Sequence, residues 1–289
     1  MFLVRWISRW PLRLLHAVGG LLGWLVWLGS PTYRRRLRTN AGLAGVSARD
    51  RRRAIAEAGR MVAETPWLWL TATNDDLLRQ VQWRGAQALE GYIAERRPLV
   101  ILTPHMGSFE VTAQACAERF ADVSGPITVL YRPARKAVLR AVMDESRARP
   151  GVATAPATLA GVRQMIRALR RGEVVGLLPD QVPPAGMGVW APFFGRPAYT
   201  MTLAARLVQQ TGAVPLLIWG ERLARGAGYV VRVSAFDEAL PAAAGDESTQ
   251  AESAAVINRA MERLIRQCPG QYLWGYNRYK TPRSNEPAA

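Results

Sequence analysis

The segment Leu102–Glu110 (LTPHMGSFE) holds the residues best suited to chemistry, because it places a histidine and a carboxylate five positions apart. If a buried strand ends at Pro104, His105 lies in the turn behind it, and Gly107 permits a tight turn into a helix. Glu110 can then reach His105 from the first helical turn, whereas on one continuous helix the two side chains would point about 140° apart. A carboxylate bonded to one imidazole nitrogen makes the other a better general base, which suits deprotonation of a hydroxyl for acyl transfer.

A second acidic candidate, Asp180, follows the apolar run Val174–Leu178, which we interpret as another buried strand. Sites in open α/β sheets occur at the carboxyl ends of such strands. The residues alone leave alternatives open. His105 can be a structural histidine that caps a helix, and Asp180 can be a turn or helix-capping residue.

From about residue 84 the sequence alternates between helical patterns and short apolar strands. This alternation predicts an α/β fold, with a mixed, mostly parallel central sheet flanked by helices. The expected strands are Pro98–Thr103, Ile127–Tyr131, Val174–Leu178, Val214–Trp219 and Tyr229–Ala235. The expected helices are Gly85–Arg96, Ser108–Phe120, Ala134–Arg149, Thr158–Arg171, Thr202–Thr211 and Gln250–Gln267, with a Pro- and Gly-rich loop over residues 181–199.

The N-terminal run Leu14–Gly29 has no charged residue, is flanked by arginines on both sides and contains tryptophans that suit a membrane interface. As a helix it would be about 24 Å long, short of the roughly 30 Å hydrocarbon core. We expect a membrane-anchoring helix that either spans with snorkelled arginines or lies in the interface. A buried helix of a soluble protein and a cleaved signal peptide are the alternatives, although Arg34–Arg36 after the run opposes export. His16, inside the run, is expected at the interface and outside catalysis.

These patterns divide the chain into four parts. Residues 1–30 form the anchor helix, 31–83 a helical region, 84–282 the α/β domain and 283–289 a loose tail. Within the helical region, Asp50–Met61 is expected to form a charged helix and Glu64–Leu70 a Trp-rich turn.

The composition excludes several classes of protein. Hydrophobic residues make up 49% and charged residues 21%, which is unlike a disordered chain. Two cysteines exclude a disulfide framework, and two histidines leave almost no room for a multi-histidine metal site. The net charge of +16 favours a polyanionic partner, which can be nucleic acid, anionic lipid, a phosphorylated substrate or an acidic protein.

Several segments accompany the histidine motif along the chain. In order they are His105-x4-Glu110, Tyr131-Arg132-Pro133, Arg147, Gly172-Glu173-Val174-Val175, Pro179-Asp180-Gln181, Pro192-Phe193-Phe194-Gly195 and Tyr272–Lys280. Together they resemble the bacterial lipid A biosynthesis acyltransferases, the lauroyl/myristoyl-type branch of the lysophospholipid acyltransferase superfamily. The resemblance covers nearly the whole chain, including the N-terminal anchor, whereas no single motif would be specific alone.

The resemblance implies an O-acyltransferase that moves a fatty acyl chain from its thioester on acyl carrier protein to a hydroxyl of a lipid A precursor. His105, oriented by Glu110, would take the hydroxyl proton, with no metal, cofactor or covalent enzyme intermediate. Arg147 would stabilise the oxyanion or bind phosphate, and Asp180 would order Arg147 or the active-site loop. The candidates for substrate binding are Arg132, Gln181 and Arg196.

The same resemblance gives the positive charge a use, because acyl carrier protein is acidic, lipid A precursors carry phosphates and inner-leaflet phospholipid is anionic. The expected location is the bacterial inner membrane, with the catalytic domain on the cytoplasmic side. Two alternatives stay open. One is another amphiphilic acceptor, such as a phospholipid, an ornithine lipid or a glycolipid. The other is a membrane-tethered, basic nucleic-acid-binding protein, for which no binding motif is found. Acyl chain length, the hydroxyl acylated and the oligomeric state do not follow from the sequence.

Overall fold

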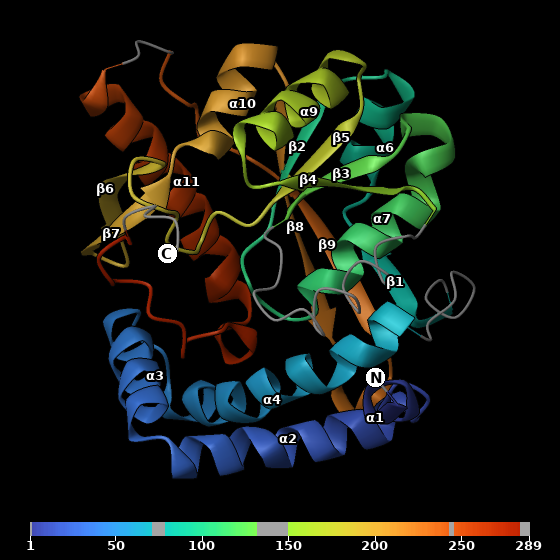
Figure 1. Cartoon of the computed structure of the whole chain (residues 1–289), viewed down its shortest axis with the longest axis vertical. Helices are drawn as coiled ribbons and strands as arrows, with labels where there is room; N and C mark the ends of the chain where they lie inside the picture. Colours follow the sequence, from blue (N-terminus) through green and yellow to red (C-terminus); the bar gives the residue numbers. More distant parts are fainter. Residues whose placement is uncertain (1, 71–78, 132–149, 243–245, 284–289) are drawn as a thin grey trace.

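The computed structural model describes residues 2–70, 79–131, 150–242 and 246–283. Its centre is a seven-stranded sheet with the strand order β1-β9-β8-β2-β5-β3-β4 (Figure 1). The strands are β1 (Val81–Arg84), β2 (Leu99–Leu102), β3 (Ile127–Tyr131), β4 (Val152–Pro156), β5 (Val174–Leu177), β8 (Val214–Arg222) and β9 (Tyr229–Ala235). All neighbouring strands are parallel except β8 and β9. The predicted mixed, mostly parallel sheet is confirmed.

Helices cover both faces of this sheet (Figure 1). They are α6 (Gln87–Ala94) and α7 (Phe109–Ser124) on one face, and α9 (Leu159–Arg170), α10 (Leu203–Thr211) and α11 (Glu247–Gln267) on the other. All four residues of β2 are buried, with Leu99 and Ile101 in the core beside α7 and Val100 and Leu102 in the core beside α11. Because both faces of β2 are packed, the position of its carboxyl end is firmly determined.

The region from 181 to 199, predicted as a loop, contains most of a hairpin. Strands β6 (Gly188–Phe193) and β7 (Arg196–Met201) pair antiparallel and pack on α11. Burial alternates along β6, as expected for a strand with one face on a core. The loop prediction was wrong because prolines and glycines at the ends and turn of the hairpin hid this alternation.

Two edge strands and one helical segment also differ from the prediction. β1 and β4 were not predicted, because each is an edge strand without a continuous apolar run. Since β1 begins at Val81, the sheet starts inside the region expected to be helical. Glu64–Leu70 is no separate turn but continues helix α4 (Ala48–Leu70), with Pro66 inside it. The predicted helix Ala134–Arg149 lies outside the described residues, and the tail is described only as far as residue 283.

The N-terminal helices lie along one edge of the molecule. They are α1 (Phe2–Ile7), α2 (Leu12–Gly29), α3 (Pro31–Leu43) and α4. α4 lies between α2 and the sheet, so α2 forms the outer boundary (Figure 1). Within the described part of the chain, α2 is the one helix long and apolar enough to cross a membrane, with a mean hydropathy of 1.4. The predicted apolar N-terminal helix is therefore present and is a candidate membrane anchor.

Candidate active site

His105 and Asp180 follow two neighbouring strands and meet at the carboxyl edge of the sheet. β2 and β5 pair in parallel with Leu102 opposite Leu177, and each site residue lies three positions beyond its member of that pair. Nδ1 of His105 lies 2.7 Å from Oδ1 of Asp180, and the backbone N–H of His105 donates to Oδ2 at 3.0 Å. One carboxylate therefore fixes both the imidazole ring and the backbone of His105.

Asp180 is sealed from solvent and held in its charged form. Its side chain is 2% exposed, against 18% for His105. Burial by itself raises the pKa of Asp180, but its interactions with His105 and the charge of Arg278 outweigh burial, so the pKa lies below its usual value. Burial, followed by the charge of Asp180, raises the pKa of Tyr272, which keeps its hydroxyl protonated. An ionised Asp180 favours the imidazole tautomer with the proton on Nδ1, which leaves Nε2 as the basic nitrogen.

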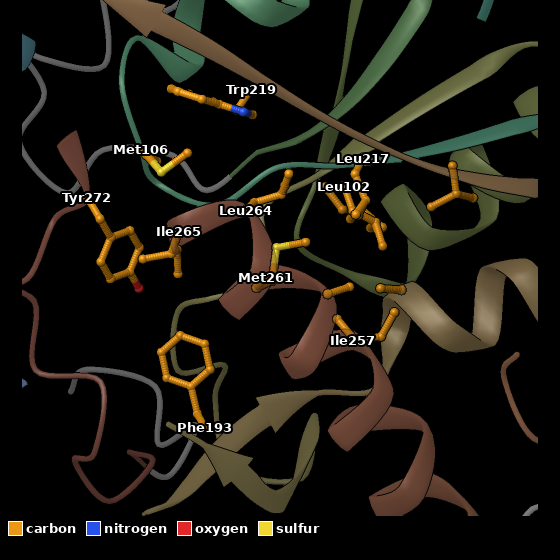
Figure 2. Packing of buried hydrophobic residues seen from close by; sticks show 14 of the residues in the cluster. Leu102, Met106, Phe193, Leu217, Trp219, Ile257, Met261, Leu264, Ile265 and Tyr272 are labelled. Atoms are coloured by element: carbon orange, nitrogen blue, oxygen red, sulfur yellow. The ribbon is translucent and has the colours of Figure 1, made fainter. Parts of the chain in front are cut away.

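The loop that carries His105 is held on every side. Met106 is fully buried, packed in the core that also contains Trp219 and Tyr272 (Figure 2). Gly107 has a φ of 59°, and a Cβ atom there would collide with the carbonyl oxygen of Gly220, so only glycine fits. The N–H of Gly107 donates to the Gln271 carbonyl at 2.9 Å. These contacts give His105 a position that does not depend on bound substrate.

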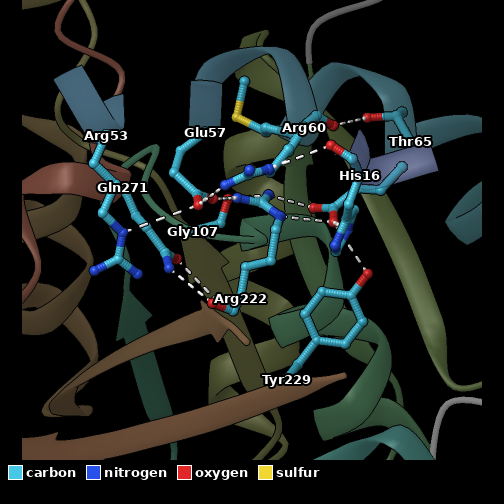
Figure 3. Close-up of polar contacts among 11 residues, drawn as sticks. His16, Arg53, Glu57, Arg60, Thr65, Gly107, Arg222, Tyr229 and Gln271 are labelled. Atoms are coloured by element: carbon cyan, nitrogen blue, oxygen red, sulfur yellow. Dashed lines mark hydrogen bonds and ion pairs between the residues drawn. The ribbon is translucent and has the colours of Figure 1, made fainter. Parts of the chain in front are cut away.

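A buried ionic cluster supports this loop from the side of the N-terminal helices (Figure 3). Arg222 donates from Nη2 to the Gly107 carbonyl, from Nε to Oε2 of Glu64, and from Nη1 to Oε2 of Glu57, each at 2.8 Å. Nε2 of His16 lies 2.8 Å from the same Oε2 of Glu64. His16 is 3% exposed, so its expected interfacial position was wrong. This contact could not be predicted, because an apolar run around a single histidine is typical of a lipid-facing segment and the partner of His16, Glu64, lies 48 residues further along the chain.

The negative charge of Glu64 is expected to make the stability of the protein depend on pH. Burial alone raises the pKa of Glu64, but Arg222 and His16 lower it from 4.5 to about 2. This shift corresponds to about 3 kcal/mol of stability that the ionised form supplies. The depressed pKa means that this stability is present above about pH 4.5 and is lost as the pH falls toward 2. We expect Glu64→Gln to lower the free energy of unfolding by about this amount at neutral pH and by much less near pH 3.

Denaturant unfolding of parent and variant at both pH values measures this difference. Glu95→Gln is the matched control, because the Glu95 side chain is 65% exposed, and it should change little at either pH. A loss for Glu64→Gln that is equally large at both pH values would show that packing, and not charge, is responsible.

A cavity of about 210 Å³ lies beside His105, between α7 and the sheet. His105 and Glu110 line it together with mostly apolar side chains, which include Ile101, Phe109, Ile127, Val129, Leu130 and Ile218. Cys116 also lines the cavity, but burial raises the pKa of its thiol to about 12, so it is not a thiolate nucleophile near neutral pH. The arrangement suits an apolar chain next to one general base.

The predicted site residues are only partly brought together. Glu110 lies in the first turn of α7 and lines the cavity with His105, as expected, but the carboxylate on Nδ1 is that of Asp180. The backbone N–H of His105 also donates to Asp180, which ties Asp180 to the loop that carries His105. The roles of Glu110 and Asp180 stay predictions.

The remaining candidates lie away from the cavity or outside the described residues. Arg132 and Arg147 belong to the segment 132–149, of which the structure describes nothing. Gln181 is half-buried next to Asp180 and is not part of the cavity lining. Arg196 is exposed on β7, with its guanidinium 4.9 Å from the ring centre of Tyr279. In the described ranges, no three His, Cys, Asp or Glu side chains are grouped so as to hold a metal ion.

Three supporting residues were not singled out from the sequence. Arg222 and Glu64 stand 158 positions apart, and nothing in the local pattern of either indicates a buried pair. Tyr272 lies in a motif that contributes to the resemblance, but its contact with Asp180 depends on how the chain end returns to the sheet. Of the supporting residues, only Gly107 could be expected from the local sequence, because a glycine two positions after a candidate base permits a tight turn.

Comparisons with known proteins identify the family that this chain resembles. A family model described as bacterial lipid A biosynthesis acyltransferase matches residues 1–281. The lipid A biosynthesis palmitoleoyltransferase of Escherichia coli K12 is 27% identical over 243 residues, which cover 81% of this chain and 74% of that protein. The lipid A biosynthesis lauroyltransferase of the same strain is 24% identical over 251 residues, 84% of this chain and 77% of that protein. A lipid A biosynthesis acyltransferase of Haemophilus influenzae is 20% identical over 283 residues, 96% and 85% of the two chains.

Proposed function

Because the chain belongs to the family of bacterial lipid A biosynthesis acyltransferases, we propose that it transfers a fatty acyl chain from acyl carrier protein to a hydroxyl of a lipid A precursor. The observation that supports this most is the bond between Nδ1 of His105 and Asp180 beside an apolar cavity. That geometry provides a base for the hydroxyl and room for a hydrocarbon chain.

In the proposed reaction, Nε2 of His105 takes the proton from the acceptor hydroxyl. The alkoxide oxygen attacks the thioester carbonyl, a C–O bond forms and the C–S bond breaks. The carrier thiolate leaves and receives the proton back from the imidazolium. Asp180 fixes the tautomer, and the carboxylate of Glu110, which lines the same cavity, stabilises the imidazolium during the transfer.

The arginines and the positive surface charge provide the stabilisation and binding that the reaction also needs. Arg147 stabilises the oxyanion or binds phosphate, for which a bidentate guanidinium is suited. Arg132, Gln181 and Arg196 contribute to substrate binding. The net charge of +16 attracts acidic acyl carrier protein, the phosphates of the precursor and anionic phospholipid.

We place the protein at the bacterial inner membrane, with the catalytic domain on the cytoplasmic side. The apolar helix α2 supports membrane association. We also propose a division of tasks along the chain into an anchor at 1–30, a helical region from 31 to the start of β1 at Val81, an α/β domain that ends at 282, and a short tail.

A purified assay tests the proposed reaction. The enzyme is mixed with acyl carrier protein thioester and a lipid A precursor, and mass spectrometry measures the product. We expect one added acyl chain on a hydroxyl of the precursor. Parallel reactions with acyl-CoA as donor, and with phospholipid, ornithine lipid or glycolipid as acceptor, test the alternatives. Transfer only to one of those acceptors would overturn the proposed substrate.

The cavity predicts how chain length is selected. Ala113 of α7 lines the cavity, so Ala113→Phe fills part of the space beside His105. We expect kcat/KM to fall on the order of tenfold or more for the longest accepted acyl donor, but little for short donors. Val123→Phe on the same helix is the control, because Val123 is 56% exposed. An equal loss for all chain lengths would place the acyl chain elsewhere.

A further inference from the structure

Helix α2 presents one continuous apolar stripe that no part of the described chain covers. Its members are Leu14, Leu21, Leu22, Leu25, Val26 and Leu28, each between 45% and 62% exposed. They recur at spacings of three, four and seven, which places them on one side of a helix. A stripe of this size on a surface helix indicates a contact with lipid or with another protein.

The opposite side of α2 is locked against α4. A Cβ atom on Gly59 of α4 would collide with the backbone of Gly19 and Gly23, so the two helices touch backbone to backbone. His16 of α2 hydrogen-bonds Glu64 of α4, which in turn pairs with Arg222 (Figure 3). Separation of α2 from α4 would leave the buried carboxylate of Glu64 without its bond to His16 and would expose the closely packed contact between the two helices.

Contacts with the rest of the molecule also hold the chain at the start of α2 and after its end. At its start, the backbone of Arg13 lies against Gly226, just beyond β8. After its end, Asn40 of α3 donates from Nδ2 to the carbonyls of Trp274 and Tyr276, both at 2.8 Å. α2 is thus a fixed edge of the enzyme and not a separate rod on a linker.

The packing of α2 on α4 distinguishes the two orientations that α2 can take at a bilayer, which are to cross it or to lie in its plane. If α2 crossed the membrane while packed as it is, α4 would enter the hydrocarbon beside it, together with exposed Arg52 and Arg53. Charged side chains are costly there, and α2 would have to separate from α4 to avoid this. We propose that α2 lies in the plane of the membrane, with its apolar stripe at the boundary between lipid headgroups and acyl chains.

The flanking charges fit this orientation. Arg5, Arg9 and Arg13 before the stripe and Arg35 and Arg38 after it are all exposed. A crossing helix favours positive charge at its cytoplasmic end, whereas an in-plane helix brings both ends to the same anionic surface. The proposed occupant of the stripe is therefore a phospholipid bilayer that contains anionic lipid. This inference rests on the membrane location in the proposed function.

Depth measurements in vesicles test it. Single cysteines replace Leu14, Leu21, Leu25 or Leu28 in the full chain and are labelled with a small fluorophore. The two native cysteines are buried, so unsubstituted protein serves as the labelling blank. The protein is bound to vesicles of zwitterionic and anionic phospholipid, and lipids with quenchers at two depths report the position of each label. Thermal unfolding and acyl transfer of each variant confirm that it is folded.

The in-plane orientation predicts the same shallow depth for all four labels. A crossing helix instead separates positions 14 and 28 by about 21 Å along the bilayer normal and places position 21 near the midplane. That result would overturn the inference but leave the membrane location intact. Absence of vesicle binding would overturn the location itself. Labels shielded from every lipid quencher in a self-associated protein would assign the stripe to a second copy of the chain.

A matched pair of substitutions gives an independent measurement. Leu25→Asn removes one apolar side chain from the middle of the stripe, and Val123→Asn removes a similarly exposed one from helix α7, which is not part of the stripe. We expect Leu25→Asn to weaken vesicle partitioning on the order of tenfold, and Val123→Asn to leave it unchanged. Equal partitioning of both variants would contradict the role of the stripe.

Discussion

Replacing His105 with alanine is expected to lower kcat for acyl transfer by about 10³-fold, because the reaction loses its general base. The KM for the acyl donor should change little, since the cavity that holds the acyl chain is lined mainly by other residues. A purified assay with acyl carrier protein thioester and lipid A precursor measures both constants.

A second substitution separates chemistry from folding. His105→Asn retains a side-chain donor for Asp180, which keeps its bond to the backbone N–H of residue 105. We therefore expect this variant to unfold at nearly the parent temperature and to be as inactive as the alanine variant. Parent-like turnover in either variant would remove His105 from the chemistry and leave it a structural histidine.

Asp180→Asn is expected to reduce kcat by about 10²- to 10³-fold through the tautomer of His105. The asparagine amide can donate to Nδ1, which then becomes the acceptor, and the ring proton moves to Nε2. In that form His105 cannot take a proton from the hydroxyl. Nitrogen NMR of labelled protein reports the tautomer directly, and with only two histidines in the chain the spectrum holds two imidazoles.

Glu110→Gln distinguishes the two carboxylates. It should leave the tautomer as in the parent and lower kcat only about tenfold, because an anion that stabilises the imidazolium during the transfer is lost. If Glu110→Gln changes the tautomer and Asp180→Asn does not, the assignment of the orienting carboxylate is reversed.

The position of the candidate base could be predicted because its signals are local. The apolar run of β2, the turn at Gly107 and the helix behind it lie within one segment, so their order places His105 at a strand end. The partner on Nδ1 could not be predicted, because Asp180 stands 75 residues further along and becomes a neighbour only through the pairing of β2 with β5. The carboxylate nearest in sequence, Glu110, was the choice that local spacing favoured.

The N-terminal helices could be predicted only in part, because their contacts also join residues that are far apart in the sequence. Charge and hydropathy predicted an apolar helix at the N-terminus, and α2 is that helix. The glycines that seat it on α4, and the buried His16–Glu64–Arg222 contacts, join three elements from distant parts of the chain. Composition cannot distinguish a helix that is lipid-facing on all sides from one with a locked side and an exposed side.

Mass spectrometry of lipid A from living cells tests whether this protein, through His105, performs secondary acylation of lipid A. We expect cells that lack this protein to produce lipid A without one secondary acyl chain. The parent gene should restore that chain, and the gene with His105→Ala should not, at equal protein levels. Unchanged lipid A in the deleted strain, or full restoration by the His105→Ala gene, would exclude this role for His105.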